Sequence, residues 1–186
     1  MAYTFSIEMP NTLPLISRIA ASWTDLATKA IVDAVTDNPD ADYYAAGFWL
    51  FYVDYTLFGV PCLALNTEEN LAASDPSCRW SPPEWLVDVH PCFESVKPLY
   101  TELSELLDGA SDDDWDTAID QHHDAMCELC RKLTLEYHSP EGAFGSITKN
   151  PKFVFGIFEE RETEEVYAAL LKGSIEPERR ATLKGL

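Results

Sequence analysis

A chain of 186 residues with 46% hydrophobic residues can bury a core of its own, which excludes a disordered tail. Its 32 Asp and Glu residues against 13 Lys and Arg give a formal net charge of −19. This excess repels the phosphates of nucleic acids and the anionic surface of membranes, so we expect the protein to bind neither. The same charge suits a basic protein partner, because electrostatic attraction accelerates the encounter.

Cysteine usage and hydropathy indicate the compartment. The five cysteines are an odd number and lie far apart, at positions 62, 78, 92, 127 and 130, which is typical of a reducing cytoplasm. The N-terminus lacks the basic start and long apolar run of a signal peptide. The apolar run at residues 43–53 is bounded by Asp42 and Asp54 and is far shorter than the roughly 20 residues of a membrane span. We therefore predict a cytoplasmic protein.

The first third of the chain predicts a helix followed by a strand hairpin. Residues 11–36 repeat apolar side chains at spacings of three and four, which is typical of an amphipathic helix, and Pro14 fits in its first turn. Two runs rich in aromatic side chains, residues 43–53 and 55–65, predict buried strands that pair antiparallel. Pro61 removes one donor from the ladder, so we expect an edge position or a bulge there.

Shorter elements are expected after the hairpin. Asn66 or Thr67 can cap a short helix that ends near residue 73, with two glutamates at its positive end. Residues 80–85 predict a turn and the start of a further helix, with Ser81 as its cap and a proline in its first turn. A helix is then expected over residues 92–107, ended by an Asp-Gly pair.

The second half predicts one long helix and a single clear strand. Ser111 caps the long helix, whose apolar stripe continues to a stop at residues 140–142. The elements expected after it are an extension or partner strand at residues 145–148, a strand at 153–158, a helix at 163–171 and a mostly unstructured charged tail at about 176–186. Together these elements predict a single α+β domain over residues 1–186, with a small, largely antiparallel sheet covered by several helices.

The connection after the hairpin contains a candidate ligand-binding or catalytic site, formed by Glu68, Arg79, Trp80, Glu84 and Trp85. Two tryptophans beside an arginine can frame a flat pocket or stack the guanidinium. A carboxylate held against apolar walls has a raised pKa, which is the starting condition for general acid catalysis. The structural alternative is that Arg79 pairs with Glu84 or Glu68 while the rings seal the exposed end of the hairpin.

Four potential metal ligands share the long predicted helix: His122, His123, Cys127 and Cys130. At about 100° per residue, Cys127 lies about 40° from His123 and Cys130 about 20° in the other direction, so three ligands could face one side. A straight helix does not easily close a tetrahedron alone, and a fourth ligand would come from Cys78, His90 or Cys92. The alternative places His122 and Cys130 in the apolar stripe. We assign no metal and no other cofactor. The C-x-x-C spacing lies late in the helix, where the dipole does not lower a thiol pKa.

An acidic face begins the long helix. It comprises Asp112, Asp113, Asp114 and Asp116, continued by Asp120 and Asp124. A calcium loop needs oxygen ligands at regular spacing, a glycine turn and a closing glutamate, and this run lacks that pattern. Interaction with the helix dipole accounts for the acidic run structurally. The functional alternative is a docking surface for a basic protein.

Three motifs follow the tyrosine-rich hairpin in order: N-T-E-E-x-L at residues 66–71, R-W-S-P-x-E-W at 79–85 and E-G-x-F-G at 141–145. This pattern resembles a bacterial family of small proteins catalogued as domain of unknown function 4303. The resemblance runs from the first helix to the last strand and implies the same domain limits and α+β class. It implies no catalytic residue. Residues 159–162 match the acidic turn of that family only loosely.

The chain contains no complete catalytic or cofactor motif. Residues 141–145 lack the Gly-Lys ending of a phosphate loop, and the serines lack a nucleophile elbow. The leading hypothesis is a non-catalytic protein-binding module that holds a basic protein partner, for example an immunity protein that neutralises a nuclease toxin. The alternative is a small enzyme or ligand-binding protein with its pocket at residues 79–85.

Overall fold

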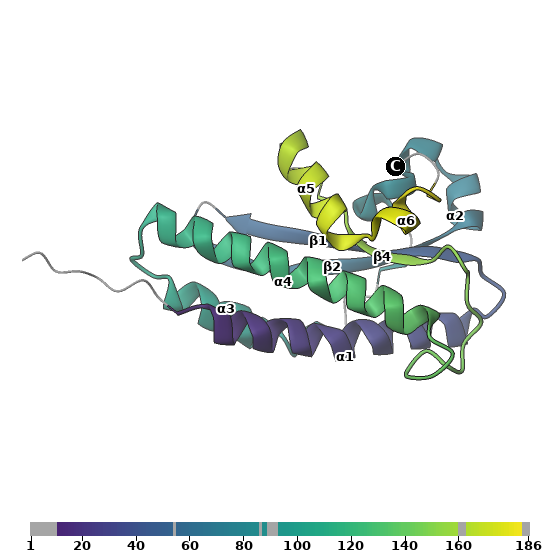
Figure 1. The fold of residues 1–186 in the computed structure, drawn as a ribbon, viewed down its shortest axis with the longest axis horizontal. Coiled ribbons are helices and arrows are strands. Elements are labelled where there is room, and N and C mark those ends of the chain that lie inside the picture. Colours follow the sequence, from purple (N-terminus) through teal and green to yellow (C-terminus); the bar gives the residue numbers. More distant parts are fainter. Residues whose placement is uncertain (1–10, 54, 86, 89–92, 160–162, 184–186) are drawn as a thin grey trace, which may run out of the picture.

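The computed structural model describes residues 11–53, 55–85, 87–88, 93–159 and 163–183, and Figure 1 shows how its helices and strands are arranged. Its sheet has the strand order β3-β2-β1-β4; β2 pairs antiparallel with β1 and β3, and β4 pairs parallel with β1. The elements in chain order are α1 (Leu13–Asp37), β1 (Tyr43–Val53), β2 (Leu57–Thr67), α2 (Glu68–Ala73), the 3₁₀ turns η1 (Pro76–Trp80) and η2 (Pro82–Glu84), β3 (Val87–Asp88), α3 (Lys97–Leu106), α4 (Asp112–His138), β4 (Val154–Ile157), α5 (Glu164–Ser174) and α6 (Pro177–Arg180). The predicted single-domain α+β class with a largely antiparallel sheet is confirmed.

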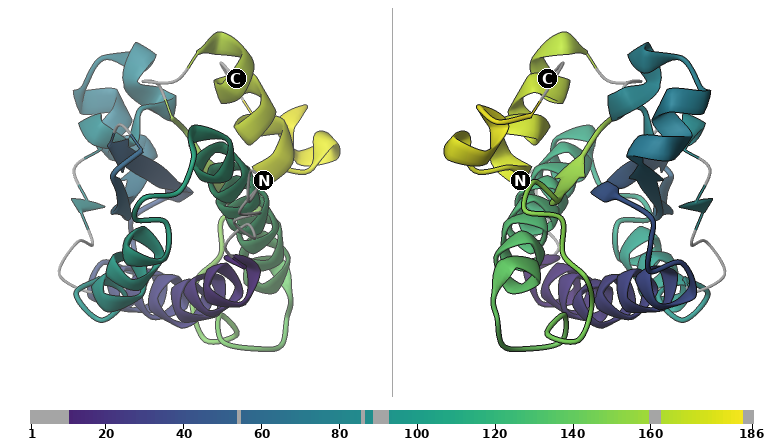
Figure 2. Two further views of the ribbon diagram at one scale, coloured as in Figure 1. Left: turned by 90° about the vertical axis from the view of Figure 1, so that its left-hand side faces the viewer. Right: turned by 90° about the vertical axis from the view of Figure 1, so that its right-hand side faces the viewer.

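The two faces of the sheet bury separate cores. On one face α1, α3 and α4 pack against the sheet around Trp23, Phe48 and Leu133 (Figures 1 and 2). On the other face, α2, the two 3₁₀ turns and the end of α5 surround Tyr44 and Phe158.

None of the described helices is both long enough and apolar enough to traverse a lipid bilayer.

Pro61 lies at a bulge, as one of the two sequence-based alternatives predicts. Trp49 faces Cys62, but Phe51 faces Gly59, so β2 has one more residue than β1 between these pairs. Beyond the end of β4, the Leu50 amide donates to the carboxylate of Glu159 at 3.1 Å, and the Trp49 indole N–H donates to the same carboxylate at 3.2 Å. The buried Glu159 therefore extends the hydrogen bonding of β1 past the last residue of β4.

Helix caps explain why three helices begin where they do. The Thr67 hydroxyl accepts the Asn70 amide at 3.0 Å, whereas Asn66 donates to the Tyr44 hydroxyl, so Thr67 is the cap of α2. Ser111 and Asp114 form a capping box at the start of α4, and Thr163 accepts the Val166 amide at the start of α5. Because these caps join residues only three positions apart, they are the part of the fold that is easiest to predict from the sequence.

Several boundaries differ from the sequence-based prediction. Residues 145–148 form turns and not a strand, and the helix expected over 92–107 begins at Lys97, with Cys92 outside the described residues. Ser81 makes no capping hydrogen bond with its side chain, and η2 is a single 3₁₀ turn. The tail contains a short helix, α6, although it was expected to be mostly unstructured. Pro177 begins α6, as proline does at the first position of many helices.

A buried chain of hydrogen bonds ties α1 and α3 to α4 and β1. The Trp23 indole N–H donates to the Tyr100 hydroxyl at 2.9 Å, and that hydroxyl lies 3.1 Å from His122 Nε2. The Tyr52 hydroxyl lies 2.7 Å from His122 Nδ1. Each ring nitrogen of His122 therefore has a tyrosine hydroxyl as its hydrogen-bond partner. Burial lowers the pKa of His122 to about 3, so the ring stays neutral.

Candidate functional site

Three of the predicted ligand-binding residues, Arg79, Trp80 and Trp85, lie in a packed cluster with Tyr44 and Phe158, which we call the tryptophan cluster. Trp80 stacks on Phe158 at 5.4 Å and meets the edge of Tyr44 at 5.5 Å. The Trp85 indole N–H donates to the Cys78 carbonyl at 3.1 Å. Trp80 and Trp85 are only 7% and 6% exposed. Aromatic pairs at these distances add to the stability that burial provides.

Backbone and rings approach closely beneath this cluster. A Cβ atom placed on Gly47 of β1 would lie 2.6 Å from the Pro82 ring and 2.7 Å from the Trp85 ring. Only glycine allows η2 and the indole to rest directly on the strand. Two features of the sequence indicate this contact: a glycine in the middle of a strand and a tryptophan-rich connection after the hairpin.

Arg79 is held from two sides. Its guanidinium donates to both carboxylate oxygens of Glu68, at 3.0 and 2.8 Å, and lies 4.7 Å from the centre of the Tyr44 ring. The Tyr44 hydroxyl donates to the Arg79 carbonyl at 2.8 Å and accepts from Asn66. Burial raises the pKa of Tyr44 to about 12, against the opposing effects of Arg79 and Asn66. The polar groups of the cluster therefore form hydrogen bonds with one another. This is the structural alternative of the sequence analysis in which Arg79 pairs with Glu68.

Little space remains among these residues. The hollow bounded by Tyr44, Glu68, Arg79 and Trp80 measures about 50 Å³. A water molecule occupies roughly 30 Å³ in the liquid, and pockets for small molecules measure roughly 300 to 1,000 Å³. Glu84 is exposed in η2 and takes no part in the hollow. The geometry therefore favours a scaffolding role for the cluster.

Within the described part of the chain, the potential metal ligands of α4 do not converge on one site. Both ring nitrogens of His122 are occupied by tyrosine hydroxyls in the core, whereas His123 lies on the next face round the helix. Burial raises the pKa of Cys127 to about 11 and raises that of Cys130 well above its ordinary value. Among the described residues, no three His, Cys, Asp or Glu side chains converge to hold a metal ion; His90 and Cys92 lie outside that part of the chain.

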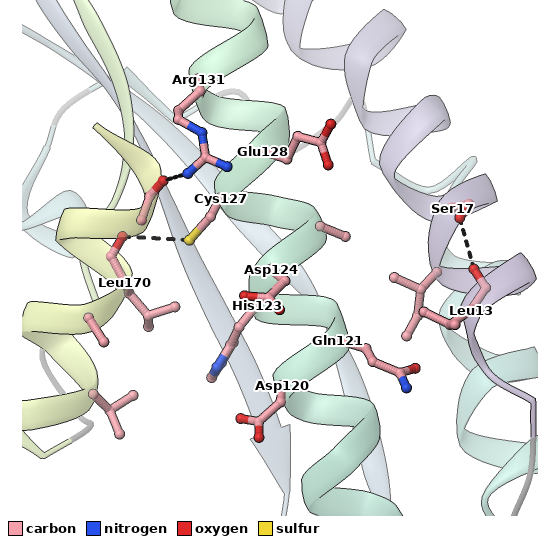
Figure 3. A pocket seen from close by; sticks show the side chains of 15 residues that line it. Leu13, Ser17, Asp120, Gln121, His123, Asp124, Cys127, Glu128, Arg131 and Leu170 are labelled. Atoms are coloured by element: carbon pink, nitrogen blue, oxygen red, sulfur yellow. Dashed lines mark hydrogen bonds between the residues drawn. The ribbon is translucent and has the colours of Figure 1, made fainter. Parts of the chain in front are cut away.

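A larger hollow lies between α1, α4 and α5, and we call it the α4 groove (Figure 3). Its volume is about 730 Å³. The middle of α4 forms its floor, with Asp120, His123, Asp124 and Glu128; α1 contributes Leu13 and Ile16, and α5 contributes Val166 and Leu170. Figure 2 shows the same arrangement from the ends of the molecule, with α1 on one side of α4 and α5 on the other.

The contacts between α4 and α5 close one end of the groove. A Cβ atom on Gly173 would lie 2.8 Å from Cys127 Sγ, so the absence of a side chain there lets α5 approach α4. The Arg131 guanidinium donates to the Gly173 carbonyl and lies 3.8 Å from a carboxylate oxygen of Glu176. The cation that lines the groove is therefore already engaged within the chain.

Acidic side chains form a row along α4, which we call the carboxylate row: Asp112, Asp116, Asp120, Asp124 and Glu128. Each is four residues from the next, about 6 Å along the helix axis, and each is exposed. Among the described residues none of the five forms an ion pair with a lysine or arginine. A hydrogen bond to Asp116 raises the pKa of Tyr55 at the tip of the hairpin.

The predicted partner-binding residues stand at the start of this row. Asp112, Asp113 and Asp116 are exposed, but Asp114 turns back to the backbone and hydroxyl of Ser111 in the capping box. The sequence analysis did not identify Glu128 or the groove. The four-residue spacing was a signal for Glu128; nothing local indicated that α1 and α5 would flank it.

His123 lies beside the carboxylates of the groove. Within the described part of the chain its Nε2 is buried and has no hydrogen-bond partner. Burial lowers the pKa of His123, and the charges of Asp120, Asp124 and Glu159 oppose that shift. A buried ring nitrogen without a hydrogen-bond partner costs free energy in the folded state.

Comparison with protein family models, with curated proteins and with solved structures finds no significant match. The α+β fold and the groove geometry are therefore the basis for the functional interpretation.

Proposed function

We propose that this protein is a non-catalytic, cytoplasmic binding module that holds a basic protein partner on the carboxylate row of α4. An immunity protein that neutralises a basic toxin, such as a nuclease, is one concrete version. Among the described cysteines, Cys78, Cys127 and Cys130 are free thiols, which supports placing the protein in a reducing compartment.

The observation that carries this proposal is the row itself. Like charges four residues apart on a helix cost about 0.2 to 0.5 kcal/mol per pair, and the row contains four such steps. The chain maintains this repulsion without a compensating lysine or arginine from its described residues. A basic surface would neutralise the row, and the net charge of −19 would steer such a partner to it.

The buried residues of the site support binding in preference to catalysis. Cys127 and Cys130 are buried thiols with raised pKa values, which disfavours the nucleophilic thiolate. His122 is neutral and engaged at both nitrogens, so it is not free to transfer a proton to a substrate.

Affinity capture with a matched pair of variants tests the proposal. The row variant D112N/D116N/D120N/D124N/E128Q removes five charges from α4; the control variant D25N/D37N/D40N/E105Q/D108N removes five exposed charges elsewhere. We expect the native protein and the control variant to retain one stoichiometric basic protein from host lysate at moderate salt, and the row variant to lose it. Equal capture by the two variants, or no stoichiometric partner at low and moderate salt, would contradict the proposal.

A further inference from the structure

The α4 groove has the form of a trough with two kinds of lining. Its walls are largely apolar or small, with Leu13 and Ile16 on α1 and Val166 and Ala169 on α5, whereas its floor carries the carboxylates of α4 (Figure 3). Leu13 is 54% exposed at the rim and contributes apolar surface there. An occupant that covers this lining must therefore be both apolar and cationic.

The dimensions suit a helix. The floor from Asp120 to Arg131 is roughly 16 Å long, about three helical turns. Amphipathic helices commonly bind in grooves between helices, with anchors at spacings of three and four residues. Carboxylates at steps of about 6 Å match lysines or arginines placed four residues apart on a helix that lies alongside α4.

The charges of the lining define the polar face of the occupant. Asp120, Asp124 and Glu128 form no ion pair with a described lysine or arginine, while Arg131 is occupied by Gly173 and Glu176. His123 Nε2 has no hydrogen-bond partner within the described residues. Ammonium and guanidinium groups supply donors and positive charge together.

We infer that the α4 groove binds a basic amphipathic helix of the partner protein. The lysine or arginine side chains of that helix pair with Asp120, Asp124 and Glu128. Its apolar side chains cover Leu13, Ile16 and Val166. This inference rests on the proposed function and adds to it the docking place and the secondary structure of the bound segment.

A synthetic peptide is a direct probe. It is a 15-residue helix with lysines at every fourth position and leucines beside them, and a scrambled peptide of the same composition is its control. Fluorescence anisotropy at moderate salt measures the Kd of both peptides for the full chain. We expect saturable one-to-one binding of the amphipathic peptide and at least about tenfold weaker binding of the scrambled one. Equal affinity for both peptides, or no binding of either, overturns the inference.

Two kinds of variant test separately whether binding needs the open hollow and whether it needs the carboxylates. A169W fills the groove from an exposed position on α5 without changing any charge, and A72W adds the same side chain at an exposed position on α2 that does not line the groove. We expect A169W to weaken peptide binding about tenfold or more and A72W to leave it unchanged. The triple variant D120N/D124N/E128Q is expected to weaken it similarly, and D25N/D37N/E105Q, which removes three charges outside the row, is expected not to.

The same variants distinguish failure of this inference from failure of the proposed function. If the triple variant D120N/D124N/E128Q loses the captured partner but A169W retains both partner and peptide, the carboxylates act from outside the groove, and only the helix inference is wrong. If the row variant captures the partner as well as its control does, the proposed function fails too. A native protein that is a dimer in gel filtration and becomes a monomer as A169W shows that a second copy occupies the groove, which also overturns the inference.

Discussion

The tryptophan cluster and the α4 groove differ in how far their polar groups are satisfied. In the cluster, Arg79 forms a bidentate pair with Glu68, and the Trp85 indole has a carbonyl partner, around a hollow of about 50 Å³. In the groove, three carboxylates border a hollow of about 730 Å³ and form no ion pair with a lysine or arginine of the described residues. The Nε2 atom of His123 has no hydrogen-bond partner among those residues.

This difference shows which sequence signals indicate a site. Aromatic residues and an arginine in one connection attract attention, but these side chains pack well and find partners within their own chain. Exposed carboxylates at helical spacing are individually ordinary. They become notable only when neighbouring helices form walls around them, because a walled hollow can exclude water and strengthen electrostatic interactions.

The largest expected effect is in the tryptophan cluster. We expect W85A to lower the free energy of unfolding by about 3 to 5 kcal/mol, because it removes a buried ring and its hydrogen bond to Cys78. Urea denaturation measures the change. Peptide binding by the folded variant should stay at the native level, and a loss of less than about 1 kcal/mol would show that the cluster is loosely packed.

The buried face of α4, directly behind the groove, has a pH-dependent contribution to stability. The folded-state pKa of His122, about 3, lies below its ordinary value of 6.5, so the unfolded chain takes up the proton first. The contribution is complete above pH 6.5 and is lost as the pH falls toward 3, at about 1.4 kcal/mol per unit, or about 2.7 kcal/mol by pH 4.5.

The variant H122Q isolates this effect. Chemical denaturation between pH 4.5 and 7.5 should give a free energy of unfolding that falls more steeply with decreasing pH for the native protein than for H122Q. The difference in slope should be about 1.4 kcal/mol per pH unit. Parallel curves for the two proteins would mean that His122 is charged or solvated in the folded state.

A smaller effect is expected for R79K, which retains the charge in the tryptophan cluster. Lysine lacks the planar fork that meets both oxygens of Glu68 and the flat surface that lies over Tyr44. Because Glu68 is 45% exposed, solvent screens the pair, and we expect a loss of about 1.5 kcal/mol. Thermal denaturation checks this value, and a variant as stable as the native protein would show that the bidentate geometry contributes nothing.

The smallest expected effect has the opposite sign and lies in the groove. D120N/D124N/E128Q should raise the free energy of unfolding by about 0.5 kcal/mol at low salt, since it removes like-charge repulsion along α4. The variant D112N/D113N removes two charges in the first turn of the same helix, where they interact favourably with its dipole, and should lower stability. Denaturation of both variants in parallel decides the sign, and a loss of stability in the groove variant would indicate that its carboxylates hold the fold together.

Elements that depend on neighbouring residues were predictable from the sequence. The stripe of α1, the hairpin and the cap at Ser111 follow from propensity, spacing and hydrogen bonds within a few residues. The acidic start of α4 and the α+β class were predictable for the same reason. For Pro61 and for the cap of α2 the sequence left two alternatives each, and the structure selects the bulge and Thr67.

Tertiary packing determines which distant groups meet. It places β4 parallel to β1 at the edge of the sheet, and it pairs Arg79 with Glu68 while Glu84 stays exposed. It also buries His122 in the core and leaves His123 half-buried. It also brought α1 and α5 to either side of α4, more than a hundred residues apart in the chain, and so turned a row of carboxylates into a groove. Such contacts depend on how whole elements pack, and no local pattern of residues specifies them.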